Sequence, residues 1–315
     1  MSSSSPCALV VHFHFCKSAG TALRAFLSAG SGVHRKDGWN LLDWSVPKHR
    51  KRMQTVYHEQ HGGNFWHTLK QVAAVRAALK NQQSHCQVVT LALLRDPAEQ
   101  LISAYHYPSW AQSFKAQNGS LLQLARLLGP DYFWSAPSLS CRGIDQRDAK
   151  SPSLRSEPCH RSTPGTCSSE CNATLWTKMN GFLGQLDVVA SVREYSTVAL
   201  EMAHVLGFGQ GAWERIRWRI GPGPWGWSSW RVLCNMTRPR RPRPGPKWTH
   251  EAHANVRDRV RPWVPCSGPL HDHWIRQGER LLSRRVRGQR RLDGYCKQLA
   301  ALASNRSYEH RLFWM

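Results

Sequence analysis

A lysine, two hydroxyl residues and a glycine follow the first apolar run of the chain. Residues 8–13 predict a buried strand, residues 16–21 read Cys-Lys-Ser-Ala-Gly-Thr, and residues 21–29 predict a helix. Backbone N–H groups at such a helix start bind anions, hydroxyls add donors, and a lysine adds positive charge. The pattern predicts a phosphate-binding loop whose residues are Lys17, Ser18, Ala19, Gly20, Thr21 and Ala22.

Three common anion-binding loops do not fit this segment. A Walker A loop has Gly before its Lys, whereas Lys17 precedes Gly20 and no glycine comes earlier. A tyrosine-phosphatase loop has Arg six residues after Cys, where this chain has Ala22 after Cys16. The Gly-x-Gly-x-x-Gly dinucleotide pattern is also missing there. Taken alone, the loop is more often an ordinary strand–turn–helix connection that carries a surface lysine.

A second group of polar residues follows another apolar run, residues 88–94. Arg95 comes at the expected carboxyl end of that strand, where open α/β sheets bind ligands. Asp96 as N-cap and Pro97 at the first helical position predict a helix to about residue 107, with Ser103 two turns into it. Arg95 and Ser103 could hold a phosphate. Alternatively, Arg95 closes the strand end through a structural ion pair.

Together, the two motifs resemble those of the sulfotransferases that use 3′-phosphoadenosine 5′-phosphosulfate (PAPS), especially the Golgi carbohydrate group. A further similarity is residues 187–194, which look like the late strand of that family ending in a glutamate. The resemblance covers scattered segments between about residues 8 and 207, and Cys16 and Ala19 depart from the commoner residues. The matching residues are Lys17, Ser18, Gly20, Thr21, Arg95, Ser103 and Tyr105.

The resemblance implies a three-layer α/β/α sandwich with a parallel central sheet and a P-loop-like nucleotide site. In the family the first loop holds the 5′-phosphosulfate of PAPS and the second motif holds the 3′-phosphate. The implied reaction is transfer of the sulfuryl group to a hydroxyl of a carbohydrate, which we expect to be an acidic glycan. Lys17 would stabilise the charge on the leaving phosphate, and no metal is expected.

A catalytic base is expected within residues 56–63, Val-Tyr-His-Glu-Gln-His-Gly-Gly, which we place directly after a second strand. This segment resembles the histidine-containing segment of uronyl-type sulfotransferases. His58 is the first candidate, with Glu59 and His61 behind it, because histidine titrates near neutral pH. His12 and His14 are expected to be strand residues packed beside the loop.

The remaining apolar patterns predict a helix over 67–80, a third strand over 187–192 and a helix over 196–206. Apolar runs that alternate with helices favour a doubly wound parallel sheet. We expect a catalytic core over residues 7–210, interrupted by a Cys-rich loop at about 135–174. The rest of the same domain, residues 211–315, would be irregular over 213–265 because of its prolines and helical over 271–302.

Composition narrows the class of partner. The 315 residues are 41% hydrophobic, enough for a core, and carry a formal net charge of +23, which calls for an acidic partner. Nucleic acid is not the expected partner, because no motif with its spacing occurs. Two other functions stay open. A P-loop kinase using ATP would share the fold but lacks the Walker A loop, and a non-catalytic polyanion-binding protein could use the same scaffold.

Cysteines and sequons indicate an oxidising compartment. The chain has ten cysteines and four Asn-x-Ser/Thr sequons, which favours disulfides and the Golgi lumen or another part of the secretory pathway. Zinc bound with His160 is the alternative for the cysteine cluster, and a cytoplasmic location stays open. No run of about 20 apolar residues occurs, so we expect no membrane span in this chain and any anchor outside it. The clustered cysteines are Cys141, Cys159, Cys167 and Cys171.

Overall fold

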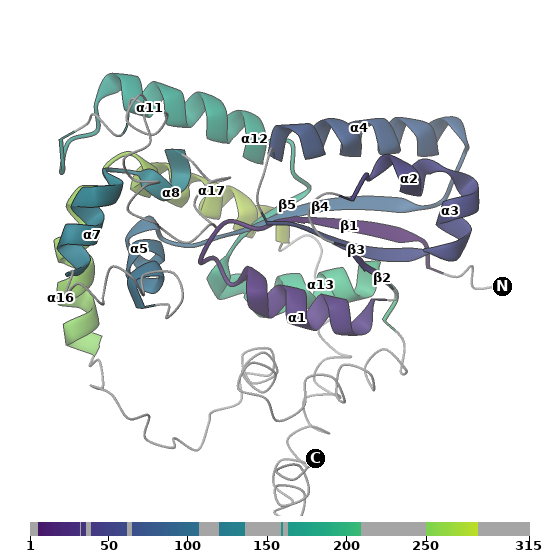
Figure 1. Ribbon diagram of the computed structural model, residues 1–315, viewed down its shortest axis with the longest axis horizontal. Coiled ribbons are helices and arrows are strands. Elements are labelled where there is room, and N and C mark those ends of the chain that lie inside the picture. Colours follow the sequence, from purple (N-terminus) through teal and green to yellow (C-terminus); the bar gives the residue numbers. More distant parts are fainter. Residues whose placement is uncertain are drawn as a thin grey trace, which may run out of the picture.

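The central sheet has five parallel strands in the order β2-β3-β1-β4-β5 (Figure 1). The structure is a computed structural model that describes residues 6–31, 33–35, 39–61, 65–106, 120–135, 159, 163–208 and 250–282. The strands are β1 (Ala8–Phe13), β2 (Val33–Arg35), β3 (Thr55–Gln60), β4 (Gln87–Leu94) and β5 (Val188–Ser191). The chain is therefore an α/β protein, as the apolar runs predicted.

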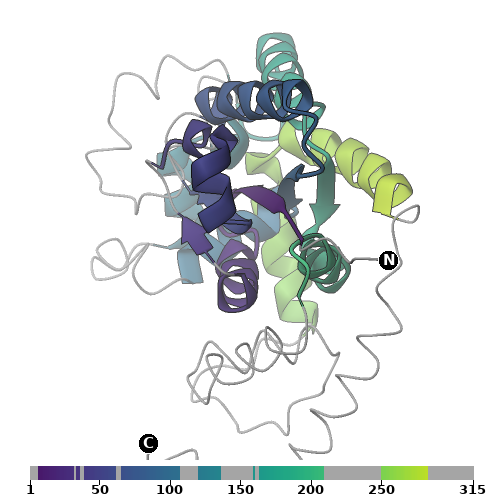
Figure 2. The ribbon, with the colours of Figure 1, turned by 90° about the vertical axis from the view of Figure 1, so that its right-hand side faces the viewer.

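Helices cover both faces of this sheet. One face packs against α1 (Gly20–Gly30) and α13 (Tyr195–Val205), and the other against α4 (Phe65–Asn81) and α12 (Gly181–Leu183) (Figure 1). The quarter-turned view in Figure 2 shows the strands between these helical layers. The other α-helices among the described residues are α2 (Leu42–Ser45), α3 (Pro47–Arg52), α5 (Pro97–His106), α7 (Leu121–Leu128), α8 (Tyr132–Ser135), α11 (Ser169–Leu175), α16 (His250–Val260) and α17 (Ser267–Leu282).

Burial on both faces explains why the strands are continuously apolar. Along β1, Leu9, Val11 and Phe13 join the core on the α4 face. Ala8 and Val10 alternate with them and join the core on the α1 face. A parallel strand that is covered by helices on both sides has no polar face, so a single apolar run serves both cores.

The strand order brings the two predicted motifs together. β1 pairs with β3 on one side and with β4 on the other. From β1 the chain leaves through α1 toward β2, whereas from β4 it proceeds toward β5, so it departs in opposite directions from two neighbouring strands. The carboxyl ends of such a pair form the crevice in which open α/β sheets bind ligands.

The predicted elements over 21–29, 67–80, 88–94, 187–192 and 196–206 are confirmed within a few residues. Three predictions are corrected. β3 covers residues 55–60, so His58 and Glu59 lie inside this strand rather than after it. α11 begins within the predicted loop over 135–174, and α16 lies within the predicted irregular segment over 213–265. The proline-rich part of that segment, residues 211–249, is outside the described residues.

Disulfides are present, as the cysteine count suggested. The bonds join Cys7 to Cys86, Cys159 to Cys171, and Cys167 to Cys266. Because Cys159, Cys167 and Cys171 are oxidised, their sulfurs are not available as zinc thiolates, and the zinc alternative fails for them. Cys141 lies outside the described residues. No helix in the described part of the chain has the length and apolar run needed to cross a bilayer.

Asp131 attaches the C-terminal helices to the core. Its carboxylate accepts backbone N–H groups of Cys266 (3.2 Å) and Ser267 (2.7 Å) at the start of α17, and its own N–H donates to the Trp263 carbonyl (2.8 Å). Burial raises the pKa of Asp131, while these N–H groups oppose the rise. A carboxyl group at a helix start stabilises it electrostatically. α17 then crosses β5 so closely that a Cβ on Gly278 would lie 2.0 Å from the Val189 carbonyl oxygen.

Candidate functional site

The loop after β1 has an unusual backbone. Lys17 (φ 62°) and Ala19 (φ 58°) both adopt the left-handed conformation, which is uncommon for residues other than glycine. Alternation of this kind turns successive N–H groups toward one concave side, where anions bind. Ala19 is the N-cap of α1 and offers no side-chain acceptor to the helix start. The first N–H groups of α1 therefore lack a capping side chain, which suits an external anion.

Gly20 is required by a neighbouring side chain. A Cβ at this position would lie 2.1 Å from the His14 ring, so the imidazole lies directly against the glycine Cα. The glycine therefore permits the close approach of His14. His14 packs beside the loop as expected, but it follows β1 and is not a strand residue. The side chain of Thr21 lies outside the described residues.

Arg95 and Lys17 are in direct contact. Arg95 Nη1 donates a hydrogen bond to the Lys17 carbonyl (3.2 Å), and Arg95 Nε lies 3.6 Å from Glu99 Oε2. The Arg95 side chain is 29% exposed, so an anion can still reach it. Glu99 and Ser103 are four residues apart on α5 and therefore share one face of that helix. The two segments predicted to bind anions thus meet at the neighbouring ends of β1 and β4.

Gln100 holds this loop from behind, a role that the sequence analysis missed. Its side-chain amide donates to the Cys16 carbonyl and to Ser18 Oγ (3.4 Å), and its carbonyl accepts the indole N–H of Trp134 (3.3 Å). The Ser18 hydroxyl is buried and also lies 3.5 Å from the Cys16 carbonyl, so it faces inward. A glutamine on the otherwise apolar face of α5 was the available signal.

The three candidate bases occupy different places. His58 is buried on the face of β3 toward α4, with its ring 5.7 Å from that of Trp39 and its Nε2 3.4 Å from Gln60 Oε1. Glu59 points to the opposite face. His61 follows the strand, is partly exposed, and stacks edge-on against His14 with ring centroids 4.5 Å apart. Glu59 and His61 therefore both adjoin the loop through His14, whereas His58 is on the other side of the sheet.

Glu59 is the charged centre of a buried network on the α1 face. Its carboxylate contacts His14 Nδ1 at 2.9 Å and Arg24 Nη1 at 3.5 Å. Burial alone would raise its pKa, but the hydrogen bond from His14 and the charges of His14, His12 and Arg24 lower the pKa of Glu59 to about 2. The carboxylate is therefore ionised at neutral pH, although its side chain is only 1% exposed.

Two further side chains complete the network. Burial and the neighbouring His14 lower the pKa of His12 to about 3, so His12 is neutral at physiological pH. Burial and the Glu59 charge raise the pKa of Tyr57, whose hydroxyl lies 2.8 Å from His12 Nδ1. The network thus keeps one buried carboxylate behind the loop, in contact with His14 and Arg24.

Comparison with known proteins found no similar protein. No protein-family model, no curated protein and no solved structure matches this chain. The site combines an uncapped helix start, a lysine with a left-handed backbone and an arginine that contacts the lysine carbonyl. This combination suits a ligand with more than one anionic group.

Proposed function

We propose that this chain is a sulfotransferase that moves the sulfuryl group of PAPS to a hydroxyl of an acidic glycan. The observation that carries the proposal is the hydrogen bond from Arg95 to the Lys17 carbonyl. Each motif alone is ambiguous, but their contact creates one site with two anion-binding parts. PAPS carries two separate anionic groups, the 5′-phosphosulfate and the 3′-phosphate, which match those parts.

The proposed roles follow from this arrangement. The start of α1 with the loop over residues 17–22 holds the 5′-phosphosulfate, and Arg95 with Ser103 holds the 3′-phosphate. The acceptor oxygen forms a bond to sulfur while the bond from sulfur to the phosphate oxygen breaks. Negative charge grows on that phosphate oxygen, and Lys17 stabilises it. The products are the sulfated glycan and 3′-phosphoadenosine 5′-phosphate.

The proton of the acceptor hydroxyl requires a base, and we assign that role to His61. It is partly exposed and adjoins the loop through His14, whereas His58 is buried on the other face of the sheet. Glu59 is held by His14 and Arg24 and is a positioning residue in this scheme. An imidazole base also has the appropriate proton affinity near neutral pH.

The compartment and the partner are part of the same proposal. Three disulfides among the described residues support an oxidising location such as the Golgi lumen. The acidic polymers of that compartment are glycans. The net charge of +23 supports an acceptor that carries uronate or sulfate groups rather than a neutral sugar.

Nucleotide binding is tested by thermal unfolding with 3′-phosphoadenosine 5′-phosphate and with ATP. At about 100 times its dissociation constant, the bisphosphate is expected to add roughly 2.7 kcal/mol to wild-type stability. Arg95→Ala should lose this gain, and Arg193→Ala, which removes an exposed arginine, should keep it. Stabilisation by ATP without stabilisation by the bisphosphate would refute the proposal and favour a kinase.

Transfer is tested with radiolabelled PAPS and uronate-containing glycans. We expect Lys17→Ala to retain nucleotide stabilisation while its turnover falls about 10²–10³-fold, because the lysine acts on the transition state. His61→Ala should lower turnover and remove the acidic limb of the pH–rate profile, and His58→Ala should leave that limb in place. A wild-type protein that binds the nucleotide and glycans without turnover would be a binding protein instead.

A further inference from the structure

A second basic surface lies far from the candidate site. α3 has the sequence Pro-Lys-His-Arg-Lys-Arg, with five basic residues in succession at 48–52. It leads into β3 at Thr55, so it lies at the edge of the sheet where the strands begin. Figure 1 shows α3 and α5 at opposite ends of the sheet. The candidate nucleotide site, which includes Arg95 before α5, is therefore separate from this surface.

α3 is held rigidly although none of its residues is buried. Arg50 donates to the Ser45 carbonyl (3.1 Å) and to Gln82 Oε1 (2.8 Å), which ties the helix to α2 and to the turn after α4. The buried Trp44 donates its indole N–H to the Met53 carbonyl (2.7 Å) and closes the other end. Of the five basic side chains, Arg50 therefore has a structural role, because it fixes α3 to the neighbouring elements. The other four basic side chains project from this fixed helix.

The other four basic side chains of α3 extend outward without acidic partners. Within the described residues, Lys48, His49, Lys51 and Arg52 are exposed and take part in no ion pair. Unneutralised charge of one sign makes a local positive potential.

Arg35 of β2 extends this surface. It lies 3.6 Å from the Met53 sulfur at the end of α3, and its guanidinium lies over the Trp39 ring at 5.9 Å. The five exposed basic residues form what we name the basic band: Arg35, Lys48, His49, Lys51 and Arg52.

We infer that the basic band is a binding surface for a polyanionic polysaccharide that carries sulfate or uronate groups. A row of cations on a rigid support matches a polymer with regularly repeated anions, and arginine binds sulfate and carboxylate in bidentate fashion. Trp39, half-buried beneath Arg35, adds an aromatic surface beside the charges. The inference does not rest on the proposed function, since binding there requires neither nucleotide nor catalysis.

Two other polyanions fit less well. The Cys7–Cys86 disulfide lies at the same edge of the sheet, directly before β1 and β4, and such bonds persist in oxidising compartments rather than where nucleic acids are. Anionic membranes bind amphipathic helices that insert an apolar face. α3 has no such face, because basic residues occupy every position from 48 to 52 around its short turn.

The test compares two triple variants of the full chain that lose the same charge. One is Lys48→Ala, Lys51→Ala, Arg52→Ala, and the control is Lys70→Ala, Arg259→Ala, Arg276→Ala, which removes exposed basic residues elsewhere. The probe is heparin, with neutral dextran as the uncharged comparison. We expect the band variant to bind heparin about tenfold more weakly and the control to change by less than about threefold, because exposed ionic contacts contribute modestly but add.

Several outcomes would overturn the inference. Equal weakening in both triples would mean that the overall charge, and not the band, attracts heparin. Tighter binding of the wild type to phosphatidylserine vesicles or to a DNA oligonucleotide than to heparin, lost in the band variant, would assign the surface to that partner. Unchanged melting temperature of the band variant shows that it is folded, and nucleotide stabilisation is scored separately, so the two proposals can fail independently.

Discussion

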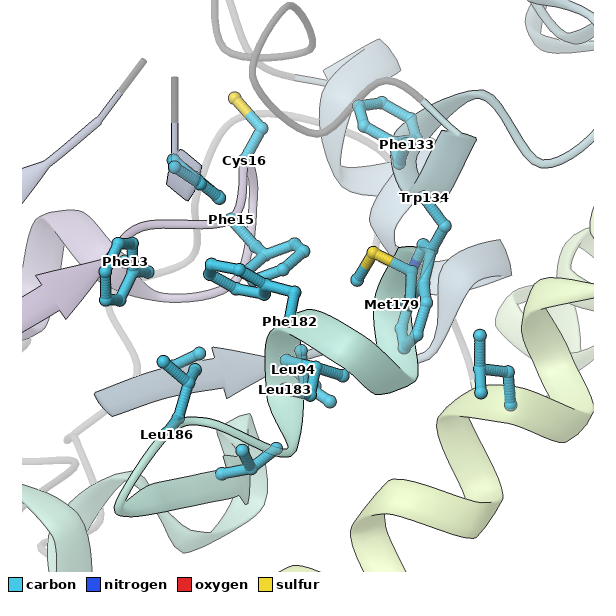
Figure 3. Close-up of a cluster of buried hydrophobic side chains, with 14 of the residues drawn as sticks. Phe13, Phe15, Cys16, Leu94, Phe133, Trp134, Met179, Phe182, Leu183 and Leu186 are labelled. Carbon is cyan, nitrogen blue, oxygen red and sulfur yellow. The ribbon is translucent and has the colours of Figure 1, made fainter. Parts of the chain in front are cut away.

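The end of β1 and the residues just after it support the candidate loop in two different ways. His12 and His14 point to the α1 face, and Phe13 and Phe15 point to the α4 face. The first pair enters a network of hydrogen bonds and charges around Glu59. The second pair enters an aromatic cluster (Figure 3). Alternation along one strand thus places a polar support and an apolar support on opposite sides of the same loop.

The apolar support depends on contact between rings. Phe13 packs edge-to-face against Phe65 and Phe182, with centroids 5.4 and 5.1 Å apart, and Phe15 continues the cluster toward Trp134. Contacts between uncharged rings do not depend on pH, and they stabilise the fold most when the rings are closely packed without voids. On the other face, the polar contacts surround the ionised carboxylate of Glu59. The comparison suggests that the aromatic side supplies stability and the polar side fixes the geometry of the loop.

The largest effect is expected from the aromatic side. Phe13 is fully buried, so Phe13→Ala should lower the free energy of unfolding by about 3–5 kcal/mol through lost burial and a residual cavity. Leu42→Ala, at a side chain that is 39% exposed, should change it by less than about 0.5 kcal/mol. Urea unfolding of both variants gives the comparison. If Phe13→Ala lowered the free energy of unfolding by less than Glu59→Gln does, the polar side and not the aromatic side would be the main source of stability.

Loss of the Glu59 charge should have the next largest effect, and it should depend on pH. Lowering its pKa from 4.5 to about 2 corresponds to roughly 3 kcal/mol of stability at pH 7. Because the folded-state pKa is lower than the unfolded one, this stability is present above about pH 4.5 and is lost as pH falls toward 2. In urea unfolding, the stability difference between the wild type and Glu59→Gln should therefore narrow to about half or less between pH 7 and pH 3. A stability difference between the two proteins that does not change with pH would show that ionisation of the Glu59 carboxyl group is not its cause.

The contact between Gly20 and His14 joins the polar side to the loop. Gly20→Ala places a methyl group against the imidazole and should destabilise the protein by about 1–3 kcal/mol. The double variant with His14→Ala should recover much of that loss, and a double-mutant cycle measures the coupling. Additive effects of the two changes would show that the ring does not restrict this position.

A smaller effect is expected at the far end of the network. Tyr57→Phe removes the hydroxyl that bonds to His12 and should lower stability by about 1 kcal/mol. The pH dependence attributed to Glu59 should persist in this variant, since His14 and Arg24 still contact the carboxylate. If Tyr57→Phe removed that dependence, the network would act as one unit rather than as separate contacts.

Local signals identified most of the elements that form the site. The apolar run before Lys17 and the one before Arg95 are both strands. Asp96 caps α5 as expected, because its carboxylate accepts the Glu99 N–H at 3.0 Å. These features depend on residues adjacent in sequence, so pattern and propensity suffice to find them.

Other features were misjudged because burial overrides local composition. Residues 55–60 read Thr-Val-Tyr-His-Glu-Gln, which is too polar for a predicted central strand. In the interior, Tyr57 and Glu59 contact His12 and His14, and Gln60 accepts a hydrogen bond from Thr68 (3.0 Å). The prolines before α16 led us to predict an irregular segment there. The last of these prolines, Pro246, precedes the first residue of α16, His250, and the next proline, Pro262, follows the end of α16.

By itself the sequence determined the alternating strands and helices, the two candidate anion-binding motifs, and a high positive charge with many cysteines. Only the tertiary structure decided how these parts meet: Arg95 against the Lys17 carbonyl, Gln100 behind Cys16, His14 between Glu59 and Gly20, and the disulfide partners. The physical reason is distance along the chain. His14 and Glu59 are 45 residues apart, and Gln100 and Cys16 are 84 apart, so strand order and not local propensity brings them together.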